Sequence, residues 1–208
     1  MAYLLQHPRE VGELLLAHLQ LIASALPVAV ALALPLAWAI ERYRWLQLPV
    51  LGALGMLYTV PSLALAVLLV PLLGLSARTA VAAMVLYAQA ILVRQTATAL
   101  ASLDPGVREA ARGMGMTAWQ RWWRVEFPLI LNPFLAGVRL AATVTLAIAA
   151  IGAKFGAGGL GTLLFDGVQQ NQPAQIWAGA IALAGLALAL NGALLALERQ
   201  LKAGAPRI

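Results

Sequence analysis

Long apolar stretches alternate with short polar ones along the chain, and this pattern predicts five membrane-spanning helices. The stretch at residues 19–40 has no charged residue. At about 1.5 Å per residue it is long enough to cross about 30 Å of hydrocarbon. Similar stretches place the spans at about residues 13–40, 48–73, 79–100, 129–151 and 174–197. An odd number of spans puts the two termini on opposite sides of the membrane.

Proline and glycine mark the breaks in this pattern. Pro61 and Pro71 lie within the second span, where a proline removes a backbone hydrogen bond and kinks or ends a helix. Gly74 and Ser76 predict a tight turn before the third span. The glycine-rich run at residues 152–161, after the fourth span, predicts a re-entrant or exterior turn.

One long polar segment, residues 104–128, separates the third span from the fourth. Its charged residues are Asp104, Arg108, Glu109, Arg112, Arg121, Arg124 and Glu126. It is the one long polar insertion in a chain that is otherwise so apolar. One interpretation is an amphipathic surface loop that only anchors the bundle to anionic lipid.

Capping residues predict that the polar segment begins with a short helix. Asp104 can accept a hydrogen bond from the first turn, and Pro105 fits the first helical position because its missing N–H has no partner there. The helix is expected to run to about Arg112 and to be broken by Gly113 and Gly115.

A second short helix is expected after the glycine turn. Thr117 and Gln120 have the spacing of a capping box, and Pro128 is expected to close the helix. Aromatic side chains favour the headgroup region of a bilayer. The segment carries three tryptophans that we expect at that depth: Trp119, Trp122 and Trp123.

Composition and charge support a membrane protein. Apolar residues make up 62% of the chain and charged residues 11%, which is more apolar surface than a soluble domain of this length can bury. The net charge of +6 does not point to nucleic acid, because the basic residues gather at the ends of the spans. The absence of cysteine excludes thiolate metal sites, and the separated His7 and His18 give no reason to expect another kind of metal site.

The distribution of basic residues predicts the orientation. If the polar segment is cytoplasmic, that side of the membrane carries Arg42, Arg44, Arg94, Arg108, Arg112, Arg121, Arg124, Arg199, Lys202 and Arg207. The other side carries only Arg9, Arg78 and Lys154. By the positive-inside rule, the N-terminus is expected outside and the C-terminus in the cytoplasm of a multi-pass protein of the bacterial inner membrane.

The polar segment resembles the cytoplasmic loop of the permease subunits of ABC importers, which has the form E-A-A, three residues, G, nine residues, I-x-L-P. Here the pattern is matched by Glu109, Ala110, Ala111, Gly115, Val125, Phe127 and Pro128, with Val for Ile and Phe for Leu. In that family the loop docks into a cleft of the ATPase, and small residues at the turn, such as Gly113, let two helices approach closely. The resemblance therefore implies ATPase coupling through Glu109 to Gly115 and Pro128.

The resemblance extends over most of the chain and is strongest to permeases that import glycine betaine, choline and other osmoprotectants. It is carried by residues 18–38, 59–65, 136–141 and 156–161 in addition to the loop. It implies an all-α, five-helix type I importer fold similar to the methionine importers, formed by one permease domain over residues 1–208. Lys154 and Phe155 depart from the pattern, because small apolar residues are expected before the last glycine run.

The partners that the resemblance implies are two cytoplasmic ABC ATPase subunits, a second permease that is identical or paralogous, and an extracytoplasmic substrate-binding protein. ATP and Mg²⁺ would bind to the ATPase, since this sequence has no GxxxxGK[ST] loop. We expect no cofactor, no nucleic acid and no enzymatic activity in this chain; its other surroundings are membrane lipid. Methionine or another amino acid remains the alternative cargo.

Polar residues within the spans are candidates for the translocation path, because burying such groups in lipid is costly. The candidates are Tyr58, Thr59, Ser62, Tyr87, Gln89, Thr143 and Thr145, although the default partner of a threonine is its own helix. Arg139 is expected to form a structural pair or to reach the cytoplasmic interface, with substrate contact as the alternative. No carboxylate or histidine pair suits a membrane enzyme. An ATP-independent channel or secondary transporter remains a rival, although it would usually show more helices or inverted repeats.

Small residues four apart predict close contacts between helices in lipid. Gly137 and Ala141 have this spacing in the fourth span, and Gly185 and Ala189 have it in the fifth.

Overall fold

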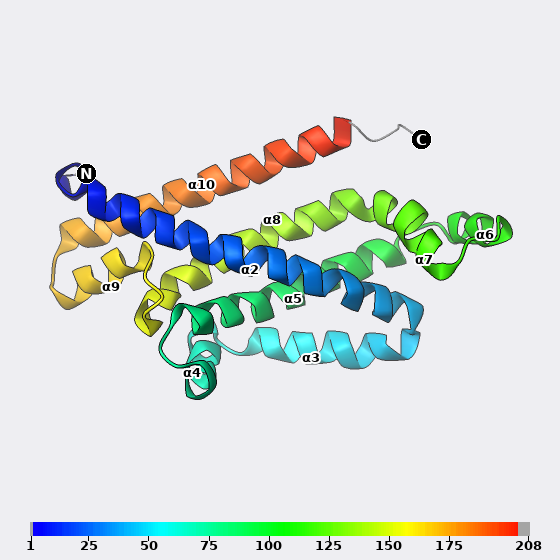
Figure 1. Ribbon diagram of the computed structural model, residues 1–208, viewed down its shortest axis with the longest axis horizontal. Coiled ribbons are helices and arrows are strands. Elements are labelled where there is room, and N and C mark those ends of the chain that lie inside the picture. The colour runs from blue at the N-terminus through cyan, green and yellow to red at the C-terminus, as the bar shows by residue number, and fades with distance from the viewer. Residues whose placement is uncertain (1, 204–208) are drawn as a thin grey trace.

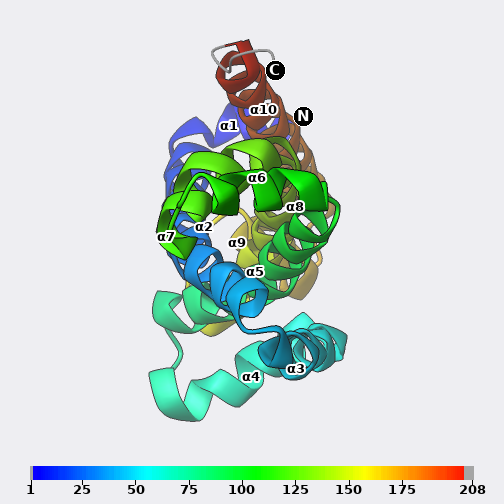
Figure 2. The ribbon, with the colours of Figure 1, turned by 90° about the vertical axis from the view of Figure 1, so that its right-hand side faces the viewer.

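Three long helices form the centre of the protein. The computed structural model describes residues 2–203, and in that range it is built of helices joined by short turns. Helices α2 (Pro8–Arg42), α5 (Ala77–Ala101) and α8 (Phe127–Gly152) lie side by side (Figures 1 and 2). They cover three of the expected spans and extend slightly beyond each of them.

Two further units flank this centre on opposite sides (Figure 2). On one side lie the short η1 (Arg44–Leu46), α3 (Gln47–Thr59) and α4 (Ser62–Leu73). On the other lies α10 (Pro173–Ala203), which runs back from the end of the molecule that holds α9 (Gly161–Gln169) toward the end that holds the polar segment (Figure 1). Four helices of the described chain are long and apolar enough to cross a membrane, or five if the bent pair α3–α4 is one span.

The second expected span is broken at Pro61. Helices α3 and α4 meet at an angle of 101°, and Val60 adopts extended backbone angles at the break. A residue before proline is driven out of the helical region by the proline ring, which explains the position of the bend. Pro71, by contrast, lies inside α4 without ending it.

The N-terminal segment is more helical than the sequence indicates. A short helix α1 (Ala2–Gln6) precedes α2, and α2 already begins at Pro8. The fixed backbone angle of proline suits the first turn of a helix, where its missing N–H costs nothing. The helix therefore continues outward beyond the apolar stretch.

Small residues allow the central helices to approach closely. Four alanines at four-residue intervals on α2 are completely buried: Ala25, Ala29, Ala33 and Ala37. On α8, Gly137 and Ala141 are also buried, and a Cβ added at Gly137 would lie 3.0 Å from Cγ of Gln95 on α5. The contact predicted for Gly185 and Ala189 is not formed within residues 2–203, because both residues are exposed on α10.

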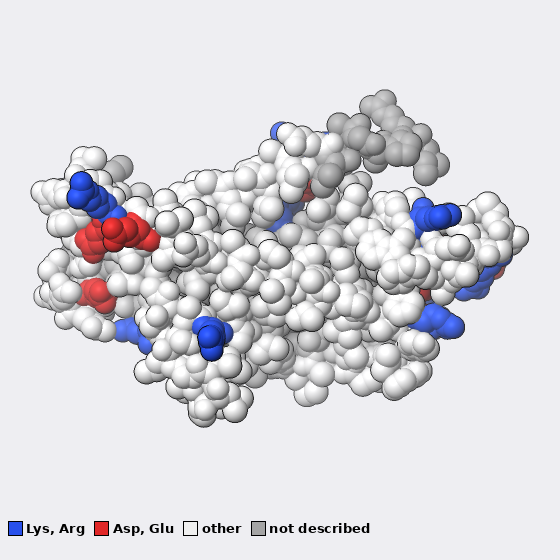
Figure 3. Space-filling model, viewed as in Figure 1, with Lys and Arg blue, Asp and Glu red and all other residues white. Residues whose placement is uncertain are grey.

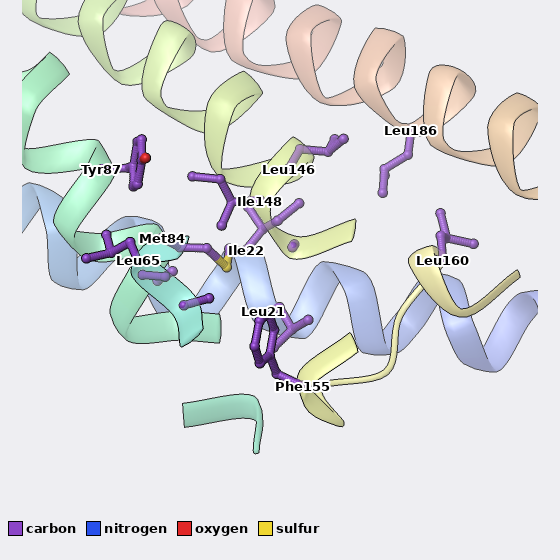
Figure 4. Close-up of a cluster of buried hydrophobic side chains, with 14 of the residues drawn as sticks. Leu21, Ile22, Leu65, Met84, Tyr87, Leu146, Ile148, Phe155, Leu160 and Leu186 are labelled. Carbon is purple, nitrogen blue, oxygen red and sulfur yellow. The ribbon is translucent and has the colours of Figure 1, made fainter. Parts of the chain in front are cut away.

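The largest apolar cluster lies toward the α9 end of the bundle (Figure 4). Leu21 and Ile22 of α2, Met84 of α5 and Leu146 of α8 meet there. Leu160, in the loop after α8, also joins this cluster, so the core fixes the loop as well as the long helices.

The loop after α8 contains a helix that the sequence does not reveal. It begins with a short η3 (Ala153–Phe155) and continues to α9 after a turn in which Gly156, Gly158 and Gly159 have positive φ. Lys154 lies 4.6 Å from the centroid of the Phe165 ring on α9. Both residues that depart from the family pattern have a place in the fold. Phe155 is buried in the core, and Lys154 covers an aromatic face.

Charged residues gather at the two ends of the elongated molecule (Figure 3). The end with α6 and α7 shows mainly basic side chains in this view, the end with α1 and α9 shows both signs, and the surface between them is almost free of charge. An apolar belt between two polar ends is the surface expected of a membrane protein.

Candidate coupling site and translocation path

The polar segment begins with the predicted capped helix. Helix α6 (Pro105–Gly113) starts at Asp104, whose Oδ1 accepts a hydrogen bond of 2.8 Å from the backbone N–H of Gly106. Glu109 and Ala110 are exposed on this helix, whereas Ala111 is buried against the rest of the protein. The exposed pair is therefore available to another protein.

Gly115 alone ends α6. Its φ is +75°, and its N–H bonds to the carbonyl of Arg112 while the N–H of Met116 bonds to that of Ala111. These two bonds form the glycine-dependent helix stop known as the Schellman motif. The prediction that Gly113 also breaks the helix is wrong, because Gly113 is its last residue and only Gly115 has the left-handed backbone.

The second helix starts as predicted but does not end as predicted. Helix α7 (Ala118–Arg121) opens with the complete Thr117–Gln120 capping box. It then widens into a π-helix, η2 (Trp122–Glu126), which continues directly into α8. Pro128 lies in the first turn of α8 and does not close the second helix. The π-turn directly before Pro128 rearranges the backbone bonds where a proline offers no N–H, so the chain stays helical.

The π-turn also changes the position of one tryptophan. Trp119 and Trp123 are exposed, as expected for side chains at headgroup depth, but Trp122 is completely buried. Its ring centroid lies 6.0 Å from that of Phe127. Trp119, Trp122 and Trp123 line an apolar groove together with Trp38 of α2.

A buried carboxylate lies at the end of the π-turn. Glu126 is only 1% exposed, and its Oε1 accepts a hydrogen bond of 2.8 Å from Nε of Arg121. Nε of Arg108 lies 3.4 Å from the same oxygen. Two guanidinium groups therefore compensate one buried negative charge, which would be costly to hold without them.

Arg108 connects α6 to the ends of three long helices. Its Nη1 lies 3.5 Å from Oε1 of Glu41 at the end of α2, and its Nη2 donates a 2.9 Å hydrogen bond to the carbonyl of Leu100 in α5. Glu126 provides the connection to α8. This network was not predicted from the sequence. Its only visible signal was the mixture of both charge signs in one short segment.

A basic groove of about 700 Å³ opens beside this network. Its charged lining residues are Glu41, Arg42, Arg44, Arg108, Glu109, Arg112 and Arg121. Arginines outnumber glutamates, so the groove is suited to an acidic surface or an anionic group.

Four of the seven candidate path residues gather at the break between α3 and α4. Tyr58 and Thr59 end α3, Ser62 begins α4, and Tyr87 of α5 donates a hydrogen bond from its hydroxyl to the carbonyl of Val60. The ring centroids of Tyr58 and Tyr87 are 5.6 Å apart. The extended backbone at Val60 exposes a carbonyl that an intact helix would satisfy, and Tyr87 provides a partner for it.

The other three candidates do not join this group. The Nε2 amide of Gln89 donates a 2.8 Å hydrogen bond to the carbonyl of Ala29 on α2. Thr143 and Thr145 each bond to a carbonyl of α8, those of Arg139 and Ala142, so both threonines have the default partner of a helical threonine.

Two further polar residues serve the fold. Nη1 of Arg139 lies 3.3 Å from Oε2 of Glu198, which joins α8 to α10 and agrees with the expected structural pair. His18 is completely buried, and its Nε2 lies 3.2 Å from the carbonyl of Leu146. No cluster of potential metal ligands is present among residues 2–203.

Comparison with known proteins adds sequence and structural relatives. The family model described as the inner-membrane component of binding-protein-dependent transport systems matches residues 25–203. The osmoprotectant import permease protein OsmW of Salmonella typhimurium is 42% identical over 194 residues, which cover 91% of this chain and 90% of that protein. The carnitine transport permease protein OpuCB of Listeria monocytogenes is 36% identical over 88% of this chain and 84% of its own length.

The fold is also found in solved structures. A chain of the MetNI methionine ABC transporter in an inward-facing conformation has a TM-score of 0.79 at 20% sequence identity, and the match covers 93% of this chain and 94% of that one. A chain of an amino acid ABC transporter has a TM-score of 0.77 at 18% identity. At these identities the likeness concerns the fold alone.

Proposed function

Because the chain belongs to the family of inner-membrane components of binding-protein-dependent transport systems, we propose that it moves an osmoprotectant, such as glycine betaine, choline or carnitine, into the cell. The membership makes it the permease subunit of an ABC importer. Its relatives are permeases and not the ATPase. ATP hydrolysis is assigned to a separate subunit, since the sequence lacks a phosphate-binding GxxxxGK[ST] loop.

The choice of cargo rests on the 42% identity to an osmoprotectant permease over nearly the whole of both chains. A permease named for glycine betaine, carnitine and choline in Bacillus subtilis is 31% identical over 88% of this chain. Methionine, the cargo named for one structural neighbour, has weaker support because that likeness is only 20% identical.

The cargo can be tested by uptake into vesicles that contain the complete transporter with its binding protein. Labelled glycine betaine, choline and carnitine are expected to accumulate only with ATP present on the side of the ATPase, and methionine is not expected to accumulate. Accumulation of methionine and none of the three others would contradict the proposed cargo. Accumulation without ATP would support a channel or secondary transporter instead.

Coupling to the ATPase is assigned to the loop that carries the family motif. Glu109 and Ala110 would enter a cleft of the ATPase, because they are exposed on α6. Ala111, Gly113, Gly115 and Pro128 would shape the loop. Two ATPase subunits, a second permease and an extracytoplasmic binding protein complete the proposed complex, in which ATP-driven closure rocks the permeases as rigid bodies.

The break between α3 and α4 is the part of the chain that we assign to the translocation path. Tyr58, Thr59, Ser62 and Tyr87 lie close to this break. A quaternary ammonium ion has no N–H donors, and aromatic faces are the surfaces that attract it. Tyr58 is exposed and Tyr87 is buried beside it, so the ring of Tyr58 is the aromatic face that we assign to contact with this cargo. Gln89, Thr143 and Thr145 are retained as weaker path candidates.

The proposed orientation places the N-terminus outside the inner membrane and the coupling loop in the cytoplasm. The chain has no cysteine, so single cysteines can be introduced without removing native thiols. In intact cells, a membrane-impermeant maleimide is expected to label Val168→Cys in α9 and not Met114→Cys beside α6. Both positions are well exposed, at 64% and 68%. Labelling of Met114→Cys from outside would contradict the orientation.

A further inference from the structure

We propose that the groove between α2 and α5 holds one membrane phospholipid, with an acyl chain along its apolar floor and the phosphate on Arg78. The lining of this groove shares no residue with the coupling loop or with the candidates for the translocation path. The site is therefore an addition to the proposed transport function and does not depend on the identity of the cargo.

The groove is an open hollow of about 840 Å³ on the surface of the central helices. Helix α2 lines it with side chains between residues 17 and 28, and α5 lines it with side chains between residues 77 and 86. These two helices lie side by side (Figures 1 and 2). Leu21, Val81 and Val85 are among the lining residues. Most of the surface that the groove offers is therefore hydrocarbon, which favours an acyl chain.

The depth and the length of the groove match one leaflet of a bilayer. The far ends of α2 and α5 meet beside α6, so both helices run in the same direction along the groove. Gln20 lies at the start of the uncharged stretch of α2, which places this end of the groove near the headgroups. The groove continues from Gln20 to Val28 and from Arg78 to Leu86. Each distance is about 12 Å of helix, close to half of the roughly 30 Å of hydrocarbon.

Arg78 is a cation without an anion at the headgroup end of the groove. Its side chain is exposed and makes no ion pair within residues 2–203. Among the described residues, no carboxylate lines the groove. A guanidinium group pairs with a phosphate through charge-assisted hydrogen bonds, often two in parallel. A phospholipid therefore supplies the charge that the groove lacks.

The start of α5 adds positive potential beside Arg78. Ser76 stands at the N-cap position but does not cap the helix, because its hydroxyl donates to the carbonyl of Leu73. Ala77, the first residue of α5, lines the groove. The positive end of a helix dipole favours an anion nearby. Arg78 remains the group on which the phosphate contact depends.

A second copy of this chain fits the groove less well than a phospholipid does. Around a two-fold axis, the same surface meets itself. Two Arg78 side chains would then approach each other, and the groove offers no carboxylate to lie between them. Burying a cation without a partner is costly. One phospholipid, by contrast, provides both an anion and an apolar chain.

The test measures lipid binding to the complete transporter in detergent by native mass spectrometry, with phosphatidylglycerol as the probe. One saturable phosphatidylglycerol molecule is expected per copy of this chain. Arg78→Gln is expected to weaken this binding by about tenfold, the effect of losing one charge-assisted contact. Arg9→Gln is the matched control, since Arg9 is also exposed but does not line the groove, and it is expected to leave the binding unchanged.

A second variant and a second lipid test the two halves of the site separately. Ala82 lines the groove one turn from Arg78, so Ala82→Trp is expected to fill it and to lower the affinity by about tenfold or more. Ala23→Trp is the control, because Ala23 is exposed on α2 outside the groove. Diacylglycerol with the same acyl chains but no phosphate is expected to compete about tenfold more weakly than phosphatidylglycerol.

Three results would overturn the site. The first is equal affinity of the native protein and Arg78→Gln, or of the two lipids, since the phosphate would then make no contact. The second is unchanged binding in Ala82→Trp, since the acyl chain would then lie elsewhere. The third is the absence of saturable binding to the complete transporter, which would favour coverage of the groove by the second permease.

Discussion

Gly161→Ala is expected to destabilise the end of the protein that holds α9. A Cβ at this position would lie 1.9 Å from the carbonyl oxygen of Ala150 and 2.6 Å from its carbonyl carbon. Both atoms belong to the backbone of α8, so no side-chain rotation can relieve the overlap. Helix α9 must therefore separate from α8, at a cost of about 3 kcal/mol or more.

The effect can be measured as the thermal unfolding of the purified chain in detergent. A loss of about 3 kcal/mol corresponds to a fall in the midpoint temperature of roughly 6 to 12 °C for a protein of this size. Gly12→Ala is the matched control, since nothing lies within 4 Å of its added Cβ and alanine favours a helix. A Gly161→Ala variant as stable as Gly12→Ala would show that α9 does not pack on α8 as described.

The fold was predictable where local chemistry determines it. Long apolar stretches predicted α5 and α8, the Asp104 cap predicted α6, and the Thr117 capping box predicted α7. All these signals lie within a few residues of the element that they specify. The all-α importer fold that the resemblance implied is confirmed by the family match and the structural relatives.

The remaining features depend on tertiary structure. Helix α9 has only 9 residues and lies between a glycine-rich run and a polar run that are typical of loops, and it is held by packing on α8 through Gly161. The sequence indicated a kink or an end at Pro61 but could not give the angle between α3 and α4. That bend is stabilised by a hydrogen bond from Tyr87, which is 27 positions away from Val60. Pro128 was expected to end a helix, but a π-turn accommodates it.

In the candidate coupling site, too, the local features were predictable and the tertiary contacts were not. The motif residues were visible because their spacing is fixed within one segment. The tie between Arg108 and Glu41 was not visible, since these residues come together only when the ends of α2 and α5 meet beside α6. The buried state of Glu126 was hidden too, because it depends on the widened helical turn that points its side chain inward.

Gly115→Val is expected to uncouple transport from ATP hydrolysis. Gly115 has φ of +75°, a conformation that costs other residues about 1–2 kcal/mol and is worse for β-branched side chains. Nothing lies within 4 Å of an added Cβ, so the penalty comes from the backbone and not from a clash. The turn is expected to rearrange, and α6 would then present Glu109 and Ala110 to the ATPase at a different angle.

Uptake by the reconstituted complex is expected to fall by about tenfold or more, since 1.4 kcal/mol corresponds to a factor of ten. Gly115→Asn is the informative comparison, because asparagine tolerates the left-handed conformation better than other residues with a side chain. Gly115→Asn should retain most of the uptake, although it places a side chain where glycine has only a hydrogen atom. If Gly115→Asn and Gly115→Val lost uptake equally, the side-chain volume at the ATPase surface, and not the backbone turn, would be the property that coupling requires.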